Sequence, residues 1–427
     1  MDFQAPTTTH LPADGTNRRL RTSSRSSAAL RFDLRWQSDA VQHCDSLFLP
    51  QVPLWRAELP QHLKDEVMNK PVGHRATRRL APGHFLPDRH RDRLLAVRAS
   101  QLNRRFLGRG HIEPRRGRFY PKGMLVTVQD SFAADRTPFR VVGIEGDSLQ
   151  VDLNHPLAGK PLEVTVTISA MLDAAVAQPG PTPNIRALLT ADGPGMQGRW
   201  QAKATDFFAD APFVRMDEDD PGFYARPRLV DHLDSAASAE IRALYGRLIP
   251  RRSRILDLMS SWQSHLPEAL DPDQVVGLGM NADELAQNPM LTERMIHDLN
   301  AEPRLPFADR TFDAVVCTVS VEYLTDPLRV FRELARVLTP GGIAVMTFSN
   351  RWFPTKVTRL WEELHEFERP GLVLEYFRAT GCFRDFNTWS LRGLPRPADD
   401  KYAHRLHQSD PVHAVWARCA GQPTMRL

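Results

Sequence analysis

Cysteine is scarce in this sequence of 427 residues, which contains only four: Cys44, Cys317, Cys382 and Cys419. They lie far apart and form no CxxC pair. This spacing argues against a zinc site and against a framework of disulfides. Unpaired thiols are typical of a reducing compartment. We therefore expect a cytoplasmic protein without a bound metal.

Long apolar runs are also lacking. No stretch of eighteen or more apolar residues occurs, so we expect no membrane-spanning helix. The first thirty residues are rich in Thr, Ser and Arg and have no apolar core of the kind that secretory signals need. Their Arg/Ser bias also occurs in transit peptides, but we favour a disordered tail over residues 1–30.

Acidic residues are few between Arg75 and Lys122, a stretch that contains thirteen arginines and one lysine but only three acids. Such a basic stretch could bind nucleic acid or an acidic partner. The aromatic residues that would stack on bases are not interleaved with it. We therefore favour a solvated arginine-rich surface and expect no nucleic-acid partner.

The length of the chain predicts two or three domains. Short apolar runs with turn signals extend over residues 31–170. Residues 171–222 are interpreted as a linker followed by an irregular segment that leads into the next domain. The stretch 178–184 contains three prolines, which end helices and central strands. From residue 223 to 427 the pattern changes again, and we expect limited proteolysis to release a stable fragment from there.

In this last part helices and strands alternate. Apolar spacing predicts helices over 235–248 and 326–338, the second with Asp326 as N-cap and Pro327 at the first helical position. Four short apolar runs predict buried strands over 254–259, 274–280, 312–319 and 342–348. Buried strands that alternate with helices indicate an α/β, doubly wound fold with a parallel sheet.

In such a sheet the ligand lies beyond the carboxyl ends of the strands. Three loops follow strands and are the candidate binding loops. They are the segments 257–262, 277–283 and 298–300.

The next segments carry a family resemblance. Leu305-Pro306-Phe307, Phe312-Asp313 and the string Val337-Leu338-Thr339-Pro340-Gly341-Gly342 resemble the class I methyltransferases with a type 11 domain, over residues 223–420. The strings 257–267 and 277–281 are similar to an atypical subgroup of that family. The resemblance implies a Rossmann-like fold, S-adenosyl-L-methionine as cofactor, and methyl transfer to an acceptor that the family does not fix.

The resemblance also implies positions for the cofactor. Asp298 would lie at the adenine, and the loop with Asp257, Ser260 and Ser261 would hold the methionine part. Here the two serines replace the usual glycines. Asp257 could instead only cap a helix, and Asp298 could be an ordinary turn carboxylate.

An acid usually follows the second strand and binds the ribose hydroxyls. That place falls on Gly279, so Asn281 or Asp283 would have to substitute. We expect the change Gly279→Asp to raise the affinity for the cofactor.

Other polar residues lie near the expected cleft. Tyr323 is a candidate substrate contact or a packing residue. His265 and Glu322 could act as a base, or could be ordinary polar groups. Trp262 could cover the adenosine or pack in the fold.

A second resemblance lies upstream. The string Asn154-His155-Pro156-Leu157-Ala158-Gly159, followed by the alternating residues Leu162, Val164, Val166 and Ile168, resembles SlyD-type FKBP prolyl isomerases. It implies a smaller α+β FKBP-like domain over residues 31–170, ahead of the methyltransferase domain over 223–427.

Two hypotheses of function follow. In the first, the chain is a methyltransferase that acts on a small-molecule or polypeptide acceptor. In the second, it is a catalytically degenerate, chaperone-like binding protein whose FKBP-like part docks polypeptides. The oligomeric state is left open.

Overall fold

The computed structural model describes residues 21–105, 111–128, 131–172, 182–191 and 193–421. No helix among these residues is long and apolar enough to span a membrane. The first strand begins at Ser27, so the end of the expected tail (1–30) is ordered as a strand. Residues 1–20 of that tail, and residues 173–181 and 192 of the expected linker and approach, lie outside the described residues.

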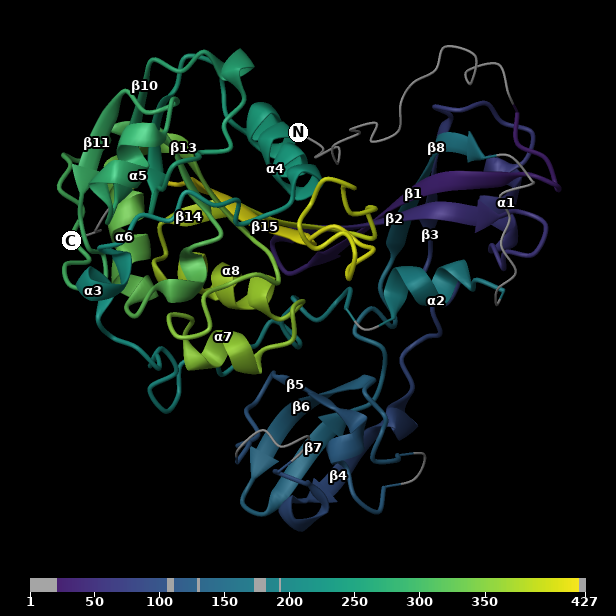
Figure 1. The fold of residues 1–427 in the computed structure, drawn as a ribbon. Helices are drawn as coiled ribbons and strands as arrows, with labels where there is room; N and C mark the ends of the chain where they lie inside the picture. Colours follow the sequence, from purple (N-terminus) through teal and green to yellow (C-terminus); the bar gives the residue numbers. More distant parts are fainter. Residues whose placement is uncertain (1–20, 106–110, 129–130, 173–181, 192, 422–427) are drawn as a thin grey trace.

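Eleven of the described strands form one sheet that crosses the whole upper part of the molecule (Figure 1). Its order is β11-β10-β9-β12-β13-β15-β14-β2-β1-β8-β3. The first five strands run parallel, which confirms the predicted doubly wound α/β arrangement. Their bounds are Glu293–Ile296 (β11), Gln274–Gly279 (β10), Arg254–Leu258 (β9), Phe312–Thr318 (β12) and Leu338–Phe348 (β13).

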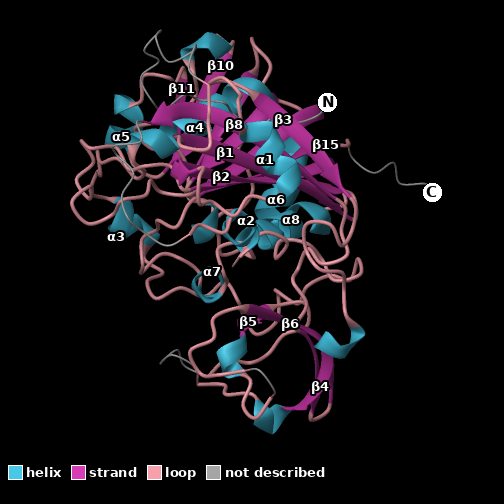
Figure 2. Ribbon diagram, turned by 90° about the vertical axis from the view of Figure 1, so that its right-hand side faces the viewer, coloured by secondary structure: helices cyan, strands magenta, loops and turns pink. Residues whose placement is uncertain are grey.

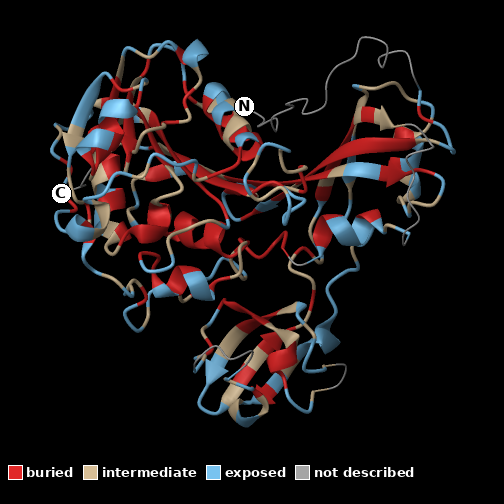
Figure 3. Ribbon diagram, in the orientation of Figure 1, coloured by how far each residue is buried: buried red, intermediate tan, exposed pale blue. Residues whose placement is uncertain are grey.

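Helices cover both faces of this parallel part, and each face buries its own apolar cluster. Figure 3 shows a buried layer of strands between partly exposed helices; β9, β10 and β12 are mostly buried, while the edge strand β11 is mostly exposed. The two predicted helices form where the sequence places them, as α4 (Ser235–Leu248) and α6 (Pro327–Val337). The Asp326 side chain caps α6 by accepting the N–H of Arg329 at 3.1 Å. The other helices here are α3 (Asp220–Tyr224), α5 (Ala282–Gln287), α7 (Arg359–Glu363) and α8 (Arg369–Ala379).

The N-terminal part holds two units instead of one. Antiparallel strands β1, β2, β8 and β3 continue the large sheet and pack on helices α1 and α2. Residues Leu162, Val164, Val166 and Ile168 are buried in that core, as their alternation predicts. The bounds are Ser27–Ser38 (β1), Val41–Pro53 (β2), Gln61–Val67 (α1), Arg75–Leu80 (β3), Leu162–Leu172 (β8) and Ile185–Thr190 (α2).

A separate four-stranded sheet is inserted between β3 and β8, in the order β4-β7-β6-β5. It has its own apolar cluster and hangs below the large sheet (Figure 2). Its strands are Leu94–Arg98 (β4), Phe119–Pro121 (β5), Pro138–Glu145 (β6) and Ser148–Asp152 (β7). We call this unit, residues 94–152, the inserted domain.

The large sheet joins the two parts that the sequence separates. Strand β15 (Val412–Cys419) pairs antiparallel with β13 on one side and with β14 (Phe383–Arg392) on the other. On its far side β14 pairs in parallel with β2, residues 386–392 with residues 41–47. A fragment that began at residue 223 would lose β2 and expose the edge of β14. The stable fragment therefore stays a prediction, and it would have to keep its fold with this edge of β14 unpaired.

Buried polar groups reinforce this junction. The Asp45 carboxylate is 3 % exposed and accepts hydrogen bonds from the Trp36 indole, the Ser390 hydroxyl and the Gln197 amide at 2.8 to 3.1 Å. Burial raises the pKa of Asp45, and these donors oppose the rise. Because Ser390 lies on β14 and Trp36 on β1, this carboxylate joins the two parts of the chain.

Candidate functional site

A cavity of about 290 Å³ lies where the parallel strands β9 to β12 end. Six of the seven residues that the sequence assigns to cofactor or substrate line it, because parallel strands bring their carboxyl ends to one edge. They are Asp257, Ser260, Ser261, Asn281, Asp298 and Tyr323. His265 and Trp262 line it as well.

Asp257 forms the floor of the cavity at the end of β9. Its carboxylate is 2 % exposed, and one oxygen accepts hydrogen bonds from the hydroxyls of Ser260 and Ser264, both at 2.6 Å. Burial raises the pKa of Asp257 to about 6, although the two serine donors lower it. Asp257 is therefore mostly ionised at neutral pH and places a negative charge in an enclosed site.

The loop after β9 turns sharply at Met259, which has a φ of 56°. Residues other than glycine are uncommon in this left-handed region of backbone conformation, and a residue found there often marks a functional site. The sequence reasoning singled out the two serines and missed this turn. Its only signal in the sequence is the place of Met259, two residues after Asp257 and directly before the two serines.

Gly279 is packed against the same loop. A Cβ atom on Gly279 would lie 2.2 Å from the carbonyl oxygen of Ser260. The expectation that Gly279→Asp improves cofactor binding is therefore wrong, because an acid at this place would displace the backbone after β9. The usual position of the ribose acid is closed by the fold itself.

The two proposed substitutes for that acid have other surroundings. The Asn281 side chain caps α5 by accepting the N–H of Glu284 at 3.0 Å, and it donates to the carbonyl oxygens of Tyr224 and Ala225 at 2.9 and 3.2 Å. Asp283 is exposed in the first turn of α5 and does not line the cavity. Its position there is explained by the favourable interaction of an acid with a helix N-terminus, so a cofactor role for Asp283 stays a prediction that the cavity lining does not support.

Glu284 is the acid that α5 brings to the cavity, and the sequence reasoning missed it. One carboxylate oxygen accepts the Ser261 hydroxyl at 2.7 Å, and the other accepts the backbone N–H of Arg228 at 2.6 Å. Its signal in the sequence is its place three residues after the helix cap, where acids are common.

Asp298 and Tyr323 line the cavity as well. Asp298 follows β11, and one of its carboxylate oxygens accepts the backbone N–H groups of Asn300 and Ala301 at 2.9 and 3.2 Å. The Tyr323 ring stacks on Phe353 at 5.9 Å, and its hydroxyl accepts the N–H of Phe353 at 2.9 Å. Each residue thus has a structural partner and also lines the cavity, so the cofactor and substrate roles remain predictions.

Glu322 lies next to Tyr323 but does not line the cavity. Its carboxyl group is 1 % exposed, and neither oxygen has a hydrogen-bond partner among the described residues. Burial raises the pKa of Glu322 to about 8, and the positive charge of Arg369 opposes the rise. The carboxyl is therefore mostly protonated at neutral pH.

Residues 223–232 form one side of the cavity, and we call this segment the strap. Tyr224, Arg228 and Val230 are among its cavity-lining residues. The candidate binding loops hold it through several hydrogen bonds. Besides those from Asn281 and Glu284, the Trp262 indole donates to the Val230 carbonyl and the Gln263 amide donates to the Asp231 carboxylate, both at 3.1 Å.

The Trp262 contact gives a test of the strap. The change Trp262→Phe keeps an aromatic ring but removes the bond to Val230, which is expected to contribute about 0.5–1.5 kcal/mol. Trypsin cleavage after Arg228 should then be about two- to tenfold faster, because proteolysis follows the population of the open form. Mass spectrometry of the fragments measures this rate. Trp55→Phe, at an exposed tryptophan that does not line the cavity, is the control. Equal rates in all three proteins would show that Trp262 does not hold the strap.

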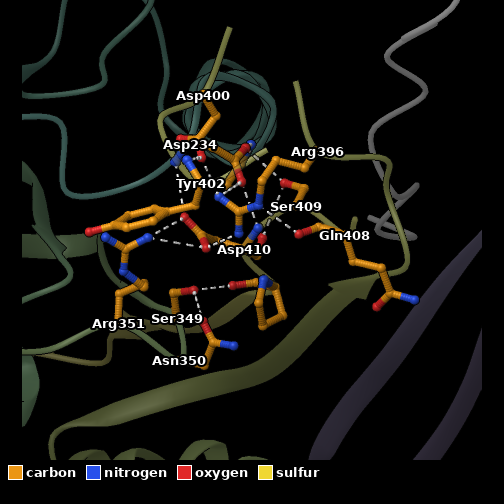
Figure 4. A network of polar contacts seen from close by, with 12 residues as sticks. Asp234, Ser349, Asn350, Arg351, Arg396, Asp400, Tyr402, Gln408, Ser409 and Asp410 are labelled. Atoms are coloured by element: carbon orange, nitrogen blue, oxygen red, sulfur yellow. Dashed lines mark hydrogen bonds and ion pairs between the residues drawn. The ribbon is translucent and has the colours of Figure 1, made fainter. Parts of the chain in front are cut away.

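A charged network lies next to the cavity, which its member Arg351 also lines (Figure 4). Asp234 caps α4, and its carboxylate also accepts the N–H of Asp410 at 2.6 Å. The Arg396 guanidinium lies 2.6 Å from the Asp410 carboxylate and 3.4 Å from the Asp234 carboxylate. Asp410 in turn pairs with Arg351 at 3.4 Å. The network therefore holds the loop 393–411 on α4 and places two cations, Arg351 and Lys401, at the cavity.

Comparison with known proteins agrees with this location. Residues 262–346 match a family described as "Methyltransferase domain". The matched segment includes Asn281, Asp283, Asp298 and Tyr323, and it begins just after Ser261.

Curated relatives match the same part of the chain. A malonyl-[acyl-carrier protein] O-methyltransferase from Marinomonas sp. is 28 % identical over 128 residues, which are 27 % of this chain and 46 % of the relative. The ubiquinone/menaquinone biosynthesis C-methyltransferase UbiE of Haemophilus ducreyi is 46 % identical over 55 residues, which are 13 % of this chain and 21 % of the relative. The chain thus spans about half or less of the length of these relatives.

Among solved structures, an S-adenosylmethionine-dependent methyltransferase from Mesorhizobium loti is 19 % identical, with a TM-score of 0.30 over 42 % of this chain and 97 % of that protein. The sequence matches carry the conclusion: the C-terminal part of this chain contains a class I methyltransferase domain.

Proposed function

We propose that the cavity binds S-adenosylmethionine and that the chain transfers its methyl group to an acceptor. The observation that carries this proposal is the place of the cavity, at the strand ends that belong to or adjoin the segment matched to the methyltransferase domain. Ligands of doubly wound sheets bind at this edge.

The chemistry of the lining fits such a cofactor. Asp257 offers a buried negative charge to the positively charged methionine part. His265 has a ring nitrogen, Nδ1, that is buried without a hydrogen-bond partner among the described residues. Burial lowers the pKa of His265 to about 4, so its ring is neutral and free to accept or donate one hydrogen bond. An unsatisfied polar atom at a cavity is expected where a ligand completes the bonding.

When bound, the cofactor supplies a methyl group that is already activated on a sulfonium. The chain therefore needs to position the acceptor and exclude water, and needs no catalytic triad. The strap lines one side of the cavity, the Asp257 charge attracts the cation, and the Tyr323 and Phe353 rings add apolar surface to the lining.

Calorimetry on the full chain tests the proposal. The natural protein should bind S-adenosylmethionine at pH 7.5, and Asp257→Asn should weaken binding by about 1–3 kcal/mol, the range for a lost hydrogen bond to a charged group. Asp283→Asn is the matched control, because Asp283 is exposed on the adjoining helix outside the cavity. A natural protein without measurable binding would contradict the proposed function, and unchanged affinity in Asp257→Asn would limit Asp257 to holding Ser260 and Ser264.

A second candidate function is a binding protein that has lost turnover. It is favoured by the closed space at Gly279 and by the use of Asn281 and Glu284 to hold the strap. Binding of the cofactor in calorimetry without methyl transfer to any acceptor would support this alternative.

The FKBP-like identity of the N-terminal part is also a proposal. Its support is an antiparallel sheet of β1, β2, β3 and β8 with a packed helix, α1, and a domain inserted before β8. The Asn154 and His155 side chains of the resembling string are used within the fold. Asn154 bonds to the backbone of His90, and His155 bonds to the carbonyl of Thr190 at 2.9 Å. Four free cysteines are consistent with the proposed cytoplasmic location.

A further inference from the structure

A second and larger cavity lies between the inserted domain and the segment around α7 and α8. Its volume is about 1200 Å³, and we call it the cleft. One wall comes from β5 and its flanking residues, and the other from residues 350–369. Figure 1 shows the inserted domain facing these helices from below. Sites for small molecules commonly measure about 300–1000 Å³, so the cleft is larger than such a ligand needs.

The lining of the cleft carries both signs of charge together with aromatic rings. Five arginines and seven carboxylates line it, with Phe119, Tyr120, Phe207 and Trp352 between them. Some of these charges pair loosely, as in Arg118 with Glu368 at 3.5 Å and Arg359 with Glu363 at 3.8 Å.

This mixture of cations, carboxylates and aromatic rings restricts the class of ligand that the cleft can bind. A nucleic acid or another polyanion requires an excess of cations, and the cleft has none. A small apolar ligand requires a mostly apolar pocket. A polypeptide backbone alternates donors and acceptors, and its side chains can use cations, carboxylates and rings in one site. The excess of carboxylates favours a neutral or basic segment.

The cleft adjoins the first cavity. Trp352 lines both, while its neighbours Arg351 and Asn350 line the first cavity and the cleft respectively. The Arg369 guanidinium lies 4.4 Å from the centre of the Trp352 ring on the side of the cleft. Trp352 therefore separates the cleft from the cavity in which the methyl donor is proposed to bind.

We propose that the cleft binds a neutral or basic polypeptide segment, one side chain of which is the methyl acceptor. This inference rests on the proposed function. A side-chain nitrogen or oxygen forms a bond to the methyl carbon, the sulfur of the donor keeps the electron pair of the broken S–C bond, and the proton of the acceptor passes to solvent. Trp352 and Arg369 form the wall that the acceptor side chain must pass.

A pool of random fifteen-residue peptides is the probe, and the immobilised full chain retains the peptides that bind. The expected result is a retained fraction enriched in lysine and arginine over aspartate and glutamate. Ala209→Trp, which adds an indole ring at a half-buried position in the lining of the cleft, should reduce retention at least tenfold. Ala133→Trp, at an exposed loop position of the inserted domain outside the lining, should leave retention unchanged.

Calorimetry with S-adenosylmethionine on the same three proteins separates the two proposals. Equal cofactor affinity in all three, with retention lost only in Ala209→Trp, supports the acceptor site. Cofactor binding without peptide retention, or retention that Ala209→Trp does not change, overturns the acceptor site and leaves the proposed function intact. Absence of cofactor binding in the natural protein overturns the proposed function itself.

Discussion

Glu322→Gln should raise the free energy of unfolding by about 4 kcal/mol at pH 9 and by less than about 1 kcal/mol at pH 5. The reason is the buried carboxyl group, whose pKa rises to about 8 in the folded chain. Because the folded state holds this proton more tightly than the unfolded state, protonation stabilises the fold. That contribution is complete below the unfolded pKa of 4.5 and is lost as the pH rises through 8. Glutamine has no proton to lose.

Urea denaturation at pH 5, 7 and 9 measures the difference. Glu362→Gln is the control, since Glu362 is exposed on α7 and should change stability little at any pH. The same gain at all three values of pH would contradict the assignment, because it would arise from packing and not from ionisation.

Lys356→Met should lower the free energy of unfolding by about 3 kcal/mol at neutral pH, as expected when one partner of a buried ion pair is removed. Lys356 is 0 % exposed, and its ammonium group lies 3.0 Å from the carboxylates of both Asp217 and Asp220. Asp220 is 2 % exposed and also pairs with Arg215 at 3.0 Å. Methionine fills a similar volume but leaves this cluster with an excess negative charge.

Urea denaturation at pH 7 measures this loss too. Arg359→Met serves as the control, because the Arg359 side chain is half exposed and its pair with Glu363 lies at the surface. A loss below about 1 kcal/mol in Lys356→Met would show that water or Arg215 compensates the buried acids.

The local parts of the fold could be predicted from the sequence. Helices α4 and α6 and the parallel strands β9, β10 and β12 follow from apolar periodicity and from caps such as Asp326, which act over a few residues. The pairing of β14 with β2 could not be predicted from the sequence, because the hydrophobic pattern of a strand does not identify a partner strand hundreds of residues away. For the same reason the sequence predicts two domains where one sheet exists.

The candidate site also has a part that the sequence predicts and a part that it does not. Topology alone placed Asp257, Ser260 and Asp298 at one edge of the sheet, since the carboxyl ends of parallel strands meet there. What each side chain bonds depended on contacts from remote segments. Asn281 holds the strap more than fifty residues upstream, and Gly279 is closed by the backbone of Ser260. Neither contact leaves a local pattern in the sequence.

The pairing of β2 with β14 has a consequence for the synthesis of the chain. His43 on β2 and Thr388 on β14 are 345 residues apart, and their side chains are hydrogen-bonded in the finished sheet. At about 5–20 residues per second, a ribosome needs roughly 17–70 s to make the intervening chain. During that time one edge of β2 lacks its neighbour, and unpaired edges of this kind invite aggregation. We therefore expect the nascent chain to depend on chaperones until β14 emerges.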